Sequence, residues 1–237
     1  MKMKMKSSVW VILFILGVLL CECEGCWKQE SEALLALNAQ FASPLPDWED
    51  NTDCCQWVRV QCNISTGRVV ALDLSAAWGN RDQNLYLNYS HFQAFQHLNS
   101  LNLANNNIAA CAANQGLMLS NLQVLDLSST SLDNAAAVQS CVNGFSTSPS
   151  LSTYHRFNAT PSPGSQSMFI NLEVLDMSFN NFNETDITSA LTGLSSLRSL
   201  KLESTQLTSG SIHNISKLRS LEILYLAENG LNESILC

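Results

Sequence analysis

The sequence predicts an α/β solenoid, a right-handed superhelix whose short parallel strands lie side by side on a concave face. One leucine pattern recurs at nearly constant intervals. Leu101 and Leu125 are 24 residues apart, Leu175 and Leu200 are 25 apart, and Leu224 follows after another 24. Within each copy, leucines alternate with other residues, which places them on one face of a strand. An amphipathic helix would instead repeat about every 3.6 residues.

The repeated unit follows the leucine-rich-repeat pattern L-x-x-L-x-L-x-x-N-x-L. Five copies begin at Leu98, Leu122, Leu172, Leu197 and Leu221. A degenerate first copy contains Val69, Leu72, Leu74 and Ala77. We expect the Asn of each copy to bond backbone groups of its own and neighbouring coils. Thr130 and Thr205 occupy that position in two copies, where a hydroxyl can do part of the same work.

Two stretches interrupt the period. The spacing between Leu74 and Leu103 predicts a longer loop over Ala76–Phe95. Leu125 and Leu175 are 50 residues apart, so residues 133–168 contain either one eroded repeat or an excursion from the solenoid. Val138 and Phe145 could anchor a degenerate coil. The Pro and Ser content favours a mobile surface loop.

The N-terminus has the layout of a signal peptide over residues 1–25. Lys2, Lys4 and Lys6 precede a twelve-residue apolar run, which is shorter than the roughly 17–25 residues of a spanning helix. Small residues, Cys23 and Gly25, lie at the −3 and −1 positions of a cut before Cys26. A signal anchor is the competing interpretation, and the short run favours cleavage.

Cysteines and glycosylation sequons point to the secretory pathway. Nine cysteines fit an oxidising compartment, and the seven beyond the leader leave an odd thiol. Cys237 is the last of them. Six Asn-x-Ser/Thr sequons predict a glycosylated extracellular surface. They are Asn63, Asn88, Asn158, Asn183, Asn214 and Asn232.

Residues 26–66 predict a cap over the first coil. Ser31–Phe41 is a candidate amphipathic helix, with Leu34, Leu37 and Phe41 spaced for one face. Two prolines follow it. Trp48 and Trp57 then bracket the adjacent pair Cys54 and Cys55. A solenoid needs such a cap because each coil contacts only its neighbours.

The cap resembles that of plant leucine-rich-repeat receptor-like proteins, which is shared with receptor-like kinases and polygalacturonase-inhibiting proteins. The matching residues are Cys26, Glu30, Ala33-Leu34-Leu35, Trp48, Asp53-Cys54-Cys55, Trp57, Cys62 and Gly67-Arg68-Val69. With the repeats, the resemblance covers nearly all of the chain beyond the leader. It implies disulfides Cys26–Cys54 and Cys55–Cys62, although four cysteines alone allow three pairings. Cys111 and Cys141 follow successive repeat strands and could also pair.

The sequence departs from the family pattern in three places, one of which is His213 where the usual Gly-x-Ile-Pro has its Pro. Arg59 stands where many relatives have a Gly after the Trp. Residues 67–237 hold about six repeats, yet no closing cysteine cap, membrane helix or kinase signature follows them before Cys237. We therefore expect a truncated product or a fragment of a longer receptor.

Catalytic and metal chemistry is not predicted. The sequence has none of the standard nucleotide-binding, zinc-protease or serine-hydrolase motifs, and no cofactor is implied. His91 and His97 do not have the spacing of a zinc site. The adjacent Cys54 and Cys55 fit a disulfide cap better than a redox pair. Asp73, Asp126 and Asp176 form a repeated column, but catalysis requires carboxylates with separated pKa values in a cleft.

Binding residues are expected among the outward positions of the strands. The candidates are Asp126, Asp176, Lys201, Glu203, Tyr225 and Glu228. The last four form the most varied patch, and Tyr is a frequent interface anchor. Any single one of them is better explained as a solvated surface residue, and it is as a group that they indicate a ligand surface.

The expected function is ligand binding by the extracellular part of a plant cell-surface receptor-like protein, in defence or developmental signalling. Its partners would be a peptide or protein ligand and a co-receptor kinase. A net charge of −8 argues against nucleic acid. Membrane attachment would come only through a missing C-terminal part. The alternatives are a secreted inhibitor of a pathogen wall-degrading enzyme and a non-functional truncated copy.

Overall fold

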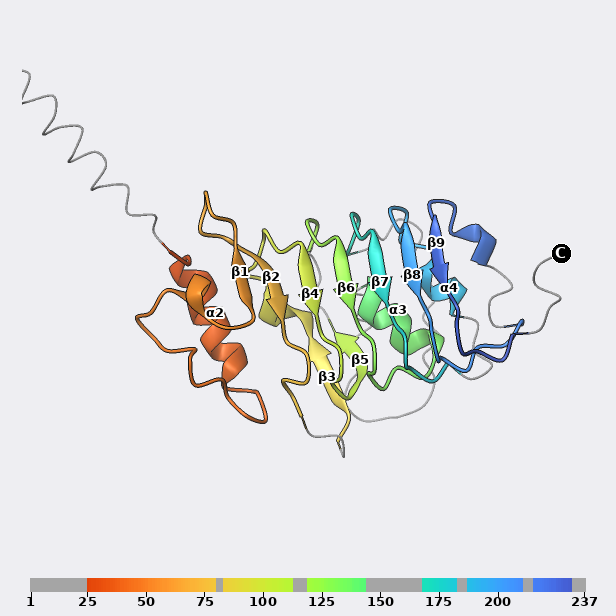
Figure 1. Cartoon of the computed structure of the whole chain (residues 1–237), viewed down its shortest axis with the longest axis horizontal. Helices are drawn as coiled ribbons and strands as arrows, with labels where there is room; N and C mark the ends of the chain where they lie inside the picture. The colour runs from red at the N-terminus through yellow and green to blue at the C-terminus, as the bar shows by residue number, and fades with distance from the viewer. Residues whose placement is uncertain are drawn as a thin grey trace, which may run out of the picture.

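A computed structural model of the chain describes residues 25–79, 83–112, 119–143, 168–182, 187–210 and 215–231. Seven strands form one sheet, in which β1 pairs antiparallel with β2 and all later neighbours pair in parallel (Figure 1). In spatial order they are β1 (Val60–Cys62), β2 (Val69–Asp73), β4 (Ser100–Asn102), β6 (Val124–Asp126), β7 (Val174–Asp176), β8 (Ser199–Lys201) and β9 (Ile223–Tyr225). The predicted α/β solenoid is confirmed.

The leucines of the repeat form the core behind this sheet. Leu101, Leu125, Leu175 and Leu200 are paired in register across the parallel strands, and each is fully buried. Leu224 on β9 continues the row but is only half-buried. Since burial of a leucine side chain is worth about 1.5–3 kcal/mol, the recurring leucine is the main source of cohesion between coils.

Asparagine side chains connect successive coils where each strand ends. Asn180 Nδ2 donates to the carbonyl of Leu127 in the preceding coil at 2.8 Å and to Met177 in its own coil at 2.9 Å. Asn106 and Asn229 make the equivalent bonds. The Thr130 hydroxyl donates to the Asn180 side chain at 2.8 Å. These bonds confirm the predicted ladder, including the part played by threonine.

The residue immediately before each Asn or Thr position of this ladder, and before Ala77 of the first coil, has a left-handed backbone. The residues are Ala76, Asn105, Ser129, Phe179, Ser204 and Glu228, with φ between 52° and 58°. This conformation turns the chain out of the sheet, and the N–H of Phe179, for example, bonds to the Glu203 carbonyl of the next coil at 2.8 Å. None of the six is glycine, so each coil accepts some backbone strain at this turn.

Helix α2 (Lys28–Asn38) lies across the N-terminal end of the stack (Figure 1). It begins and ends three residues earlier than the predicted Ser31–Phe41. The earlier end has a side-chain cause, because Asn38 bonds both the N–H and the carbonyl of Leu45 and turns the chain away. Phe41 lies beyond the helix but is still buried, 5.8 Å from Trp48 between ring centroids.

A buried ion pair joins the cap helix to the first coil. Glu30 is only 1% exposed, and its carboxylate accepts hydrogen bonds from Arg68 Nε at 2.9 Å and from the Val69 N–H at 3.0 Å. Arg68 also lies over the ring of Trp27, 4.3 Å from its centroid. The first turn of the helix is therefore fixed directly to the start of β2.

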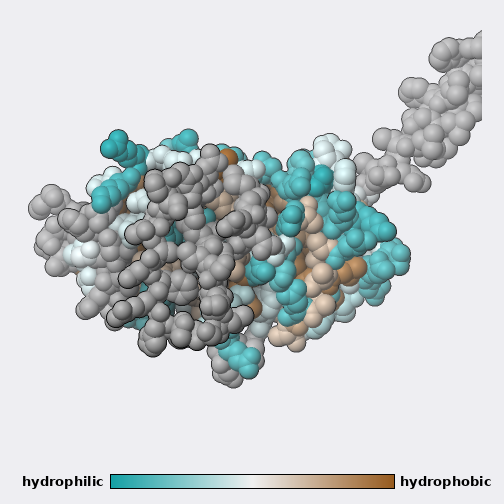
Figure 2. Space-filling model, turned by 180° about the vertical axis from the view of Figure 1, so that it is seen from behind, coloured by the Kyte–Doolittle hydropathy of each residue, from teal (hydrophilic) through white to brown (hydrophobic). Residues whose placement is uncertain are grey.

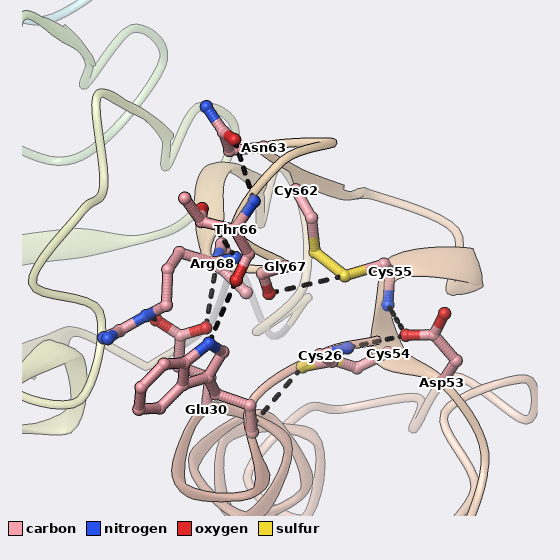
Figure 3. Close-up of a disulfide and its surroundings, with 12 residues drawn as sticks. Cys26, Glu30, Asp53, Cys54, Cys55, Cys62, Asn63, Thr66, Gly67 and Arg68 are labelled. Atoms are coloured by element: carbon pink, nitrogen blue, oxygen red, sulfur yellow. Dashed lines mark hydrogen bonds and ion pairs between the residues drawn. A yellow bond between two sulfur atoms is a disulfide. The ribbon is translucent and has the colours of Figure 1, made fainter. Parts of the chain in front are cut away.

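The cap is further fixed by disulfides and stacked indoles. The structure pairs Cys26 with Cys54 and Cys55 with Cys62, as the resemblance implies (Figure 3). Cys54 begins the short helix η1 (Cys54–Gln56). Trp48 and Trp57 stack with their centroids 5.5 Å apart. These contacts close the hydrophobic end of the solenoid.

Arg59 has a left-handed backbone with φ of 73°. This explains why glycine is the usual residue at its position, because a side chain is disfavoured in that conformation. Arg59 offsets part of the cost by donating a hydrogen bond from its guanidinium to the Ser75 carbonyl. The departure from the family pattern thus keeps the backbone turn.

The stretch Ala76–Phe95 is not only a loop, so that prediction was wrong in part. It contains β3 (Leu85–Asn88) and η2 (Tyr89–Phe92), and β3 pairs in parallel with β5 (Ile108–Ala112) to form a second, two-stranded sheet. Leu87, Tyr89 and Phe92 are buried. The alternation of apolar residues here was too short to separate from the repeat pattern around it.

Helix α3 (Ala135–Asn143) packs behind this second sheet and against α4 (Thr188–Leu191). A disulfide joins Cys111 on β5 to Cys141 on α3. The Tyr89 hydroxyl donates to the Cys141 carbonyl at 2.9 Å. Seen from behind, the described surface is largely hydrophilic, with hydrophobic side chains gathered toward the cap (Figure 2).

The interval between β6 and β7 contributes no strand to the seven-stranded sheet within the described residues. β6 pairs directly with β7, and Leu125 faces Leu175 in the register used elsewhere in the stack. This arrangement is that of an excursion, but the predicted surface loop is wrong for Ala135–Asn143, which forms the largely buried, disulfide-linked helix α3. Val138 is buried in α3, whereas Phe145 and the Pro- and Ser-rich segment lie outside the described residues. The last short helix within the described residues is η3 (Ile215–Lys217).

Candidate binding face

The outward side chains of the parallel strands form two rows, which together we call the front face. Register places these residues beside one another from β2 to β9. The first row is Ala71, Ser100, Val124, Val174, Ser199 and Ile223. The second row is Asp73, Asn102, Asp126, Asp176, Lys201 and Tyr225. Adjacent strands are about 4.8 Å apart, so neighbouring side chains can contact the same ligand.

Four of the predicted binding residues come together on this face. Asp126, Asp176, Lys201 and Tyr225 occupy one register position on four consecutive strands. Glu203 and Glu228 do not belong to the strands and lie in the turns that follow β8 and β9.

The aspartates have a structural task that the sequence analysis did not assign. Oδ1 of Asp126 accepts a hydrogen bond from the Ser128 N–H at 2.8 Å, and Asp176 does the same for Ser178 at 3.0 Å. Asp73 and Asn102 make equivalent bonds. An Asx residue that bonds the N–H two positions later is a common turn device. The repeated Asp-x-Ser spelling was a signal for this role.

Lys201 pairs with Asp176 across β7 and β8. Its Nζ lies 3.1 Å from Asp176 Oδ2, and both side chains remain partly exposed. The hydrogen bond and the charge of Asp176 hold the pKa of Lys201 above its usual value. Lys201 is therefore a fixed positive charge on the front face at neutral pH. Asp126 has no ion pair within the described part of the chain.

Exposed apolar side chains gather at the C-terminal end of the front face. Ile223 is 48% exposed and Tyr225 43%, and Val124 at the centre is 36% exposed. Phe179, in the turn after β7, is 60% exposed. Its backbone is left-handed, like that of the equivalent residue in the other coils. Phe179 was not among the predicted binding residues, and its signal in the sequence is an aromatic residue at a turn position that holds small or polar residues in the other coils.

Glu228 lies in the same row of turns as Phe179 and has a hydrogen-bond partner there. Its Oε2 accepts a hydrogen bond from the Ser204 hydroxyl at 2.7 Å. Glu228 thus continues the row of turns, and the structure places it with Ser204 instead of with Lys201.

The described residues offer surfaces for binding and no metal centre. They include no group of three or more histidine, cysteine or acidic residues placed to hold a metal ion. Within the same ranges, no helix has the length and apolar character needed to cross a bilayer.

Two family models match this chain. The model described as "Leucine rich repeat N-terminal domain" matches residues 28–63, and the "Leucine Rich Repeat" model matches residues 171–194. The first covers the cap, and the second covers the coil that contains β7. The chain belongs to the leucine-rich-repeat proteins.

This leucine-rich-repeat chain has plant receptor-like proteins as relatives. It is 30% identical over 251 residues to Cuscuta receptor 1 of Solanum lycopersicum, an alignment that covers 97% of this chain and 22% of the relative. It is also 30% identical to Receptor like protein 21 of Arabidopsis thaliana, covering 85% of this chain and 22% of that protein. The chain therefore spans about a fifth of the length of these relatives.

Solved leucine-rich-repeat ectodomains are similar in fold. The Arabidopsis receptor kinase HAESA, in a complex with the peptide hormone IDA and the co-receptor SERK1, matches with a TM-score of 0.49 and 20% identity. That match covers 86% of this chain and 34% of HAESA. The ectodomain of SOBIR1 from Arabidopsis thaliana matches at 0.46 and 16%, covering 88% and 97% of the two chains.

Two of the six sequons lie within the described residues. Asn63 is exposed in the turn after β1, and its Oδ1 accepts bonds from Ser65 and Thr66. Asn88 is half-buried at the end of β3 and bonds Ser90 in the same way. The other four, Asn158, Asn183, Asn214 and Asn232, lie outside the described residues.

Proposed function

We propose that the chain binds a peptide or protein ligand through its front face, as the extracellular ligand-binding portion of a plant receptor-like protein. The observation that supports this most is the row of exposed, chemically varied side chains on consecutive strands. Lys201, Tyr225 and Ile223 lie side by side on β8 and β9. Tyr225 and Ile223 do not belong to the buried core of this chain, since 43% and 48% of their surfaces are exposed. Their exposure leaves them available for a partner.

The ligand class follows from the chemistry of that row. Asp126 offers a carboxylate to a cationic group, Lys201 a positive charge, and Ile223 with Tyr225 an apolar surface. An extended peptide that crosses the strands can reach all three. Oδ1 of Asp126 accepts the turn hydrogen bond, which leaves Oδ2 for a cationic group of the ligand, whereas both oxygens of Asp176 already have partners within the chain.

The setting that we propose is extracellular. Residues 1–25 serve as a removable leader, residues 26–66 as the cap and residues 67–237 as repeats. Three disulfides and exposed Asn63 support maturation in the secretory pathway. Signalling in defence or development would then require a membrane-bound remainder or a co-receptor kinase.

A display experiment tests the binding face. Peptides of random sequence would be selected on the secreted protein, and their affinities measured by fluorescence polarisation. We expect selected peptides to lose at least roughly tenfold in affinity on Tyr225→Ala, because exposed aromatic anchors often dominate binding. Tyr86→Ala is the matched control, since Tyr86 is an exposed tyrosine on β3, outside the front face.

Circular dichroism would first establish that both variants are folded. Equal affinity of every selected peptide for wild type and Tyr225→Ala would contradict the proposed binding face. A loss on Tyr86→Ala alone would move the site to the second sheet.

A further inference from the structure

Asp53 binds two backbone nitrogens of the cap. Its Oδ1 accepts a hydrogen bond from the Cys26 N–H at 2.8 Å and another from the Cys55 N–H at 3.0 Å (Figure 3). The bond to Cys55 is the N-terminal cap of η1. The bond to Cys26 spans 27 residues and belongs to no helix or sheet. It therefore needs a separate explanation.

The Asp53 carboxylate also lies close to Gly25, the residue before Cys26. A Cβ at position 25 would lie 2.3 Å from both Cγ and Oδ1 of Asp53, which is far inside van der Waals contact. Only glycine fits there without displacing Asp53. The peptide bond between Gly25 and Cys26, where we expect the leader to be cut, thus lies directly beside a negative charge.

We propose that removal of the leader converts the Cys26 nitrogen into an ammonium that forms an ion pair with Asp53. Hydrolysis adds one water to the Gly25–Cys26 bond, so that Gly25 leaves as the carboxylate of the leader and Cys26 keeps the amine, which is protonated at neutral pH. In the bond seen at 2.8 Å only the acceptor is charged, and after cleavage both donor and acceptor are charged, which strengthens the bond. This inference rests on cleavage of the leader and is independent of the ligand of the front face.

One feature of the cap favours the ion pair, and another makes an anion beside Cys26 necessary. The Cys26–Cys54 disulfide, with a Cα–Cα distance of 5.2 Å, already holds Cys26 beside Asp53, so little further entropy is lost. Helix α2 begins at Lys28, and a cation so close to a helix N-terminus is unfavourable unless an anion offsets it. Asp53 supplies that anion.

The experiment begins with the N-terminus of the secreted full chain. The protein would be expressed with its own leader in plant cells, and Edman sequencing with intact mass is expected to show Cys26 as the first residue. A chain that begins at any other residue would overturn the proposal.

A double comparison then tests the ion pair. Thermal unfolding would be measured for chains starting at Cys26 with a free amine and with an acetylated amine, which keeps the N–H but not the charge, each with and without Asp53→Asn. Asn keeps an oxygen that can cap η1 but removes the charge. We expect Asp53→Asn to lower Tm by about 1–3 °C more in the chain with the free amine, and this excess to shrink in 1 M salt.

Asp47→Asn provides the matched control. Asp47 Oδ2 accepts a hydrogen bond from the Val58 N–H at 2.8 Å, whereas it is Asp53 that is bonded to the Cys26 nitrogen. Its substitution should lower Tm equally in both chains. The same loss for Asp53→Asn in both chains would reject the ion pair, even if cleavage occurs before Cys26.

Discussion

In the cap each stabilising contact occurs once, whereas in the repeat stack the same contact recurs from coil to coil. The Glu30–Arg68 pair and the stacked Trp48 and Trp57 have no copies elsewhere among the described residues. The asparagine bonds recur in three coils, with threonine hydroxyls between them. A single substitution should therefore remove much of the cap's attachment but only one rung of the ladder.

The largest effect is expected from Glu30→Ala. It leaves Arg68 and the Val69 N–H without their buried acceptor, which should destabilise the protein by roughly 3 kcal/mol. Urea denaturation would measure the loss. Glu32→Ala on the same helix is the control, because its pair with Lys28 is exposed and should contribute less than about 1 kcal/mol. Equal losses for both variants would refute a special role for Glu30.

Asn180→Ala comes next, at about 2 kcal/mol, since it leaves the buried carbonyls of Leu127 and Met177 without a donor. Thr130→Val at the same repeat position removes one hydroxyl donor and should lose about half as much. Both would be compared by urea denaturation with hydrogen exchange. If exchange rises across the cap as strongly as in the neighbouring coils, the ladder does not act locally.

Tyr89→Phe should cost about 1 kcal/mol at pH 7, because it removes the bond to the Cys141 carbonyl. Burial raises the pKa of Tyr89 well above its usual value. A raised folded-state pKa means that the stabilisation is fully present below about pH 10, the usual tyrosine pKa, and is lost as pH rises beyond it. Wild type should thus lose stability in alkali more steeply than Tyr89→Phe, which unfolding at pH 8 and pH 11 would show.

The smallest effect is expected from Lys201→Gln, below about 1 kcal/mol, because the pair with Asp176 is partly exposed. The raised pKa of Lys201 keeps the pair intact at neutral pH, and its contribution disappears only as pH rises above the usual lysine value of about 10.4. Thermal unfolding at pH 7 in low and high salt would measure it. A loss as large as that of Asn180→Ala would show that the front face stabilises the stack.

The sheet could be predicted from the sequence because its signal is repeated. A buried leucine recurs at the same position of each copy, for example at Leu101, Leu125 and Leu200. A wrong register assigned to one copy would therefore disagree with the register of all the others. The second sheet has no such redundancy. β3 and β5 pair only with each other, and the residues around Leu87 give a single short alternation.

The candidate site was predicted in part for a related reason. Register follows from the repeat, so the positions of Asp126, Asp176, Lys201 and Tyr225 could be placed on one row. What each side chain contacts is decided locally. The turn bonds of Asp126 and the left-handed backbone of Phe179 depend on geometry that residue spacing does not encode.

The direct pairing of β6 with β7 also bears on how such a protein can change over generations. Leu125 faces Leu175 across the strands although the connection between them is twice the usual length. The register of the sheet therefore does not depend on the length of that connection, whereas α3 within it is tied to β5 by the Cys111–Cys141 disulfide. Natural variation in the connection outside α3 can change its length while the spacing of the front row is inherited intact.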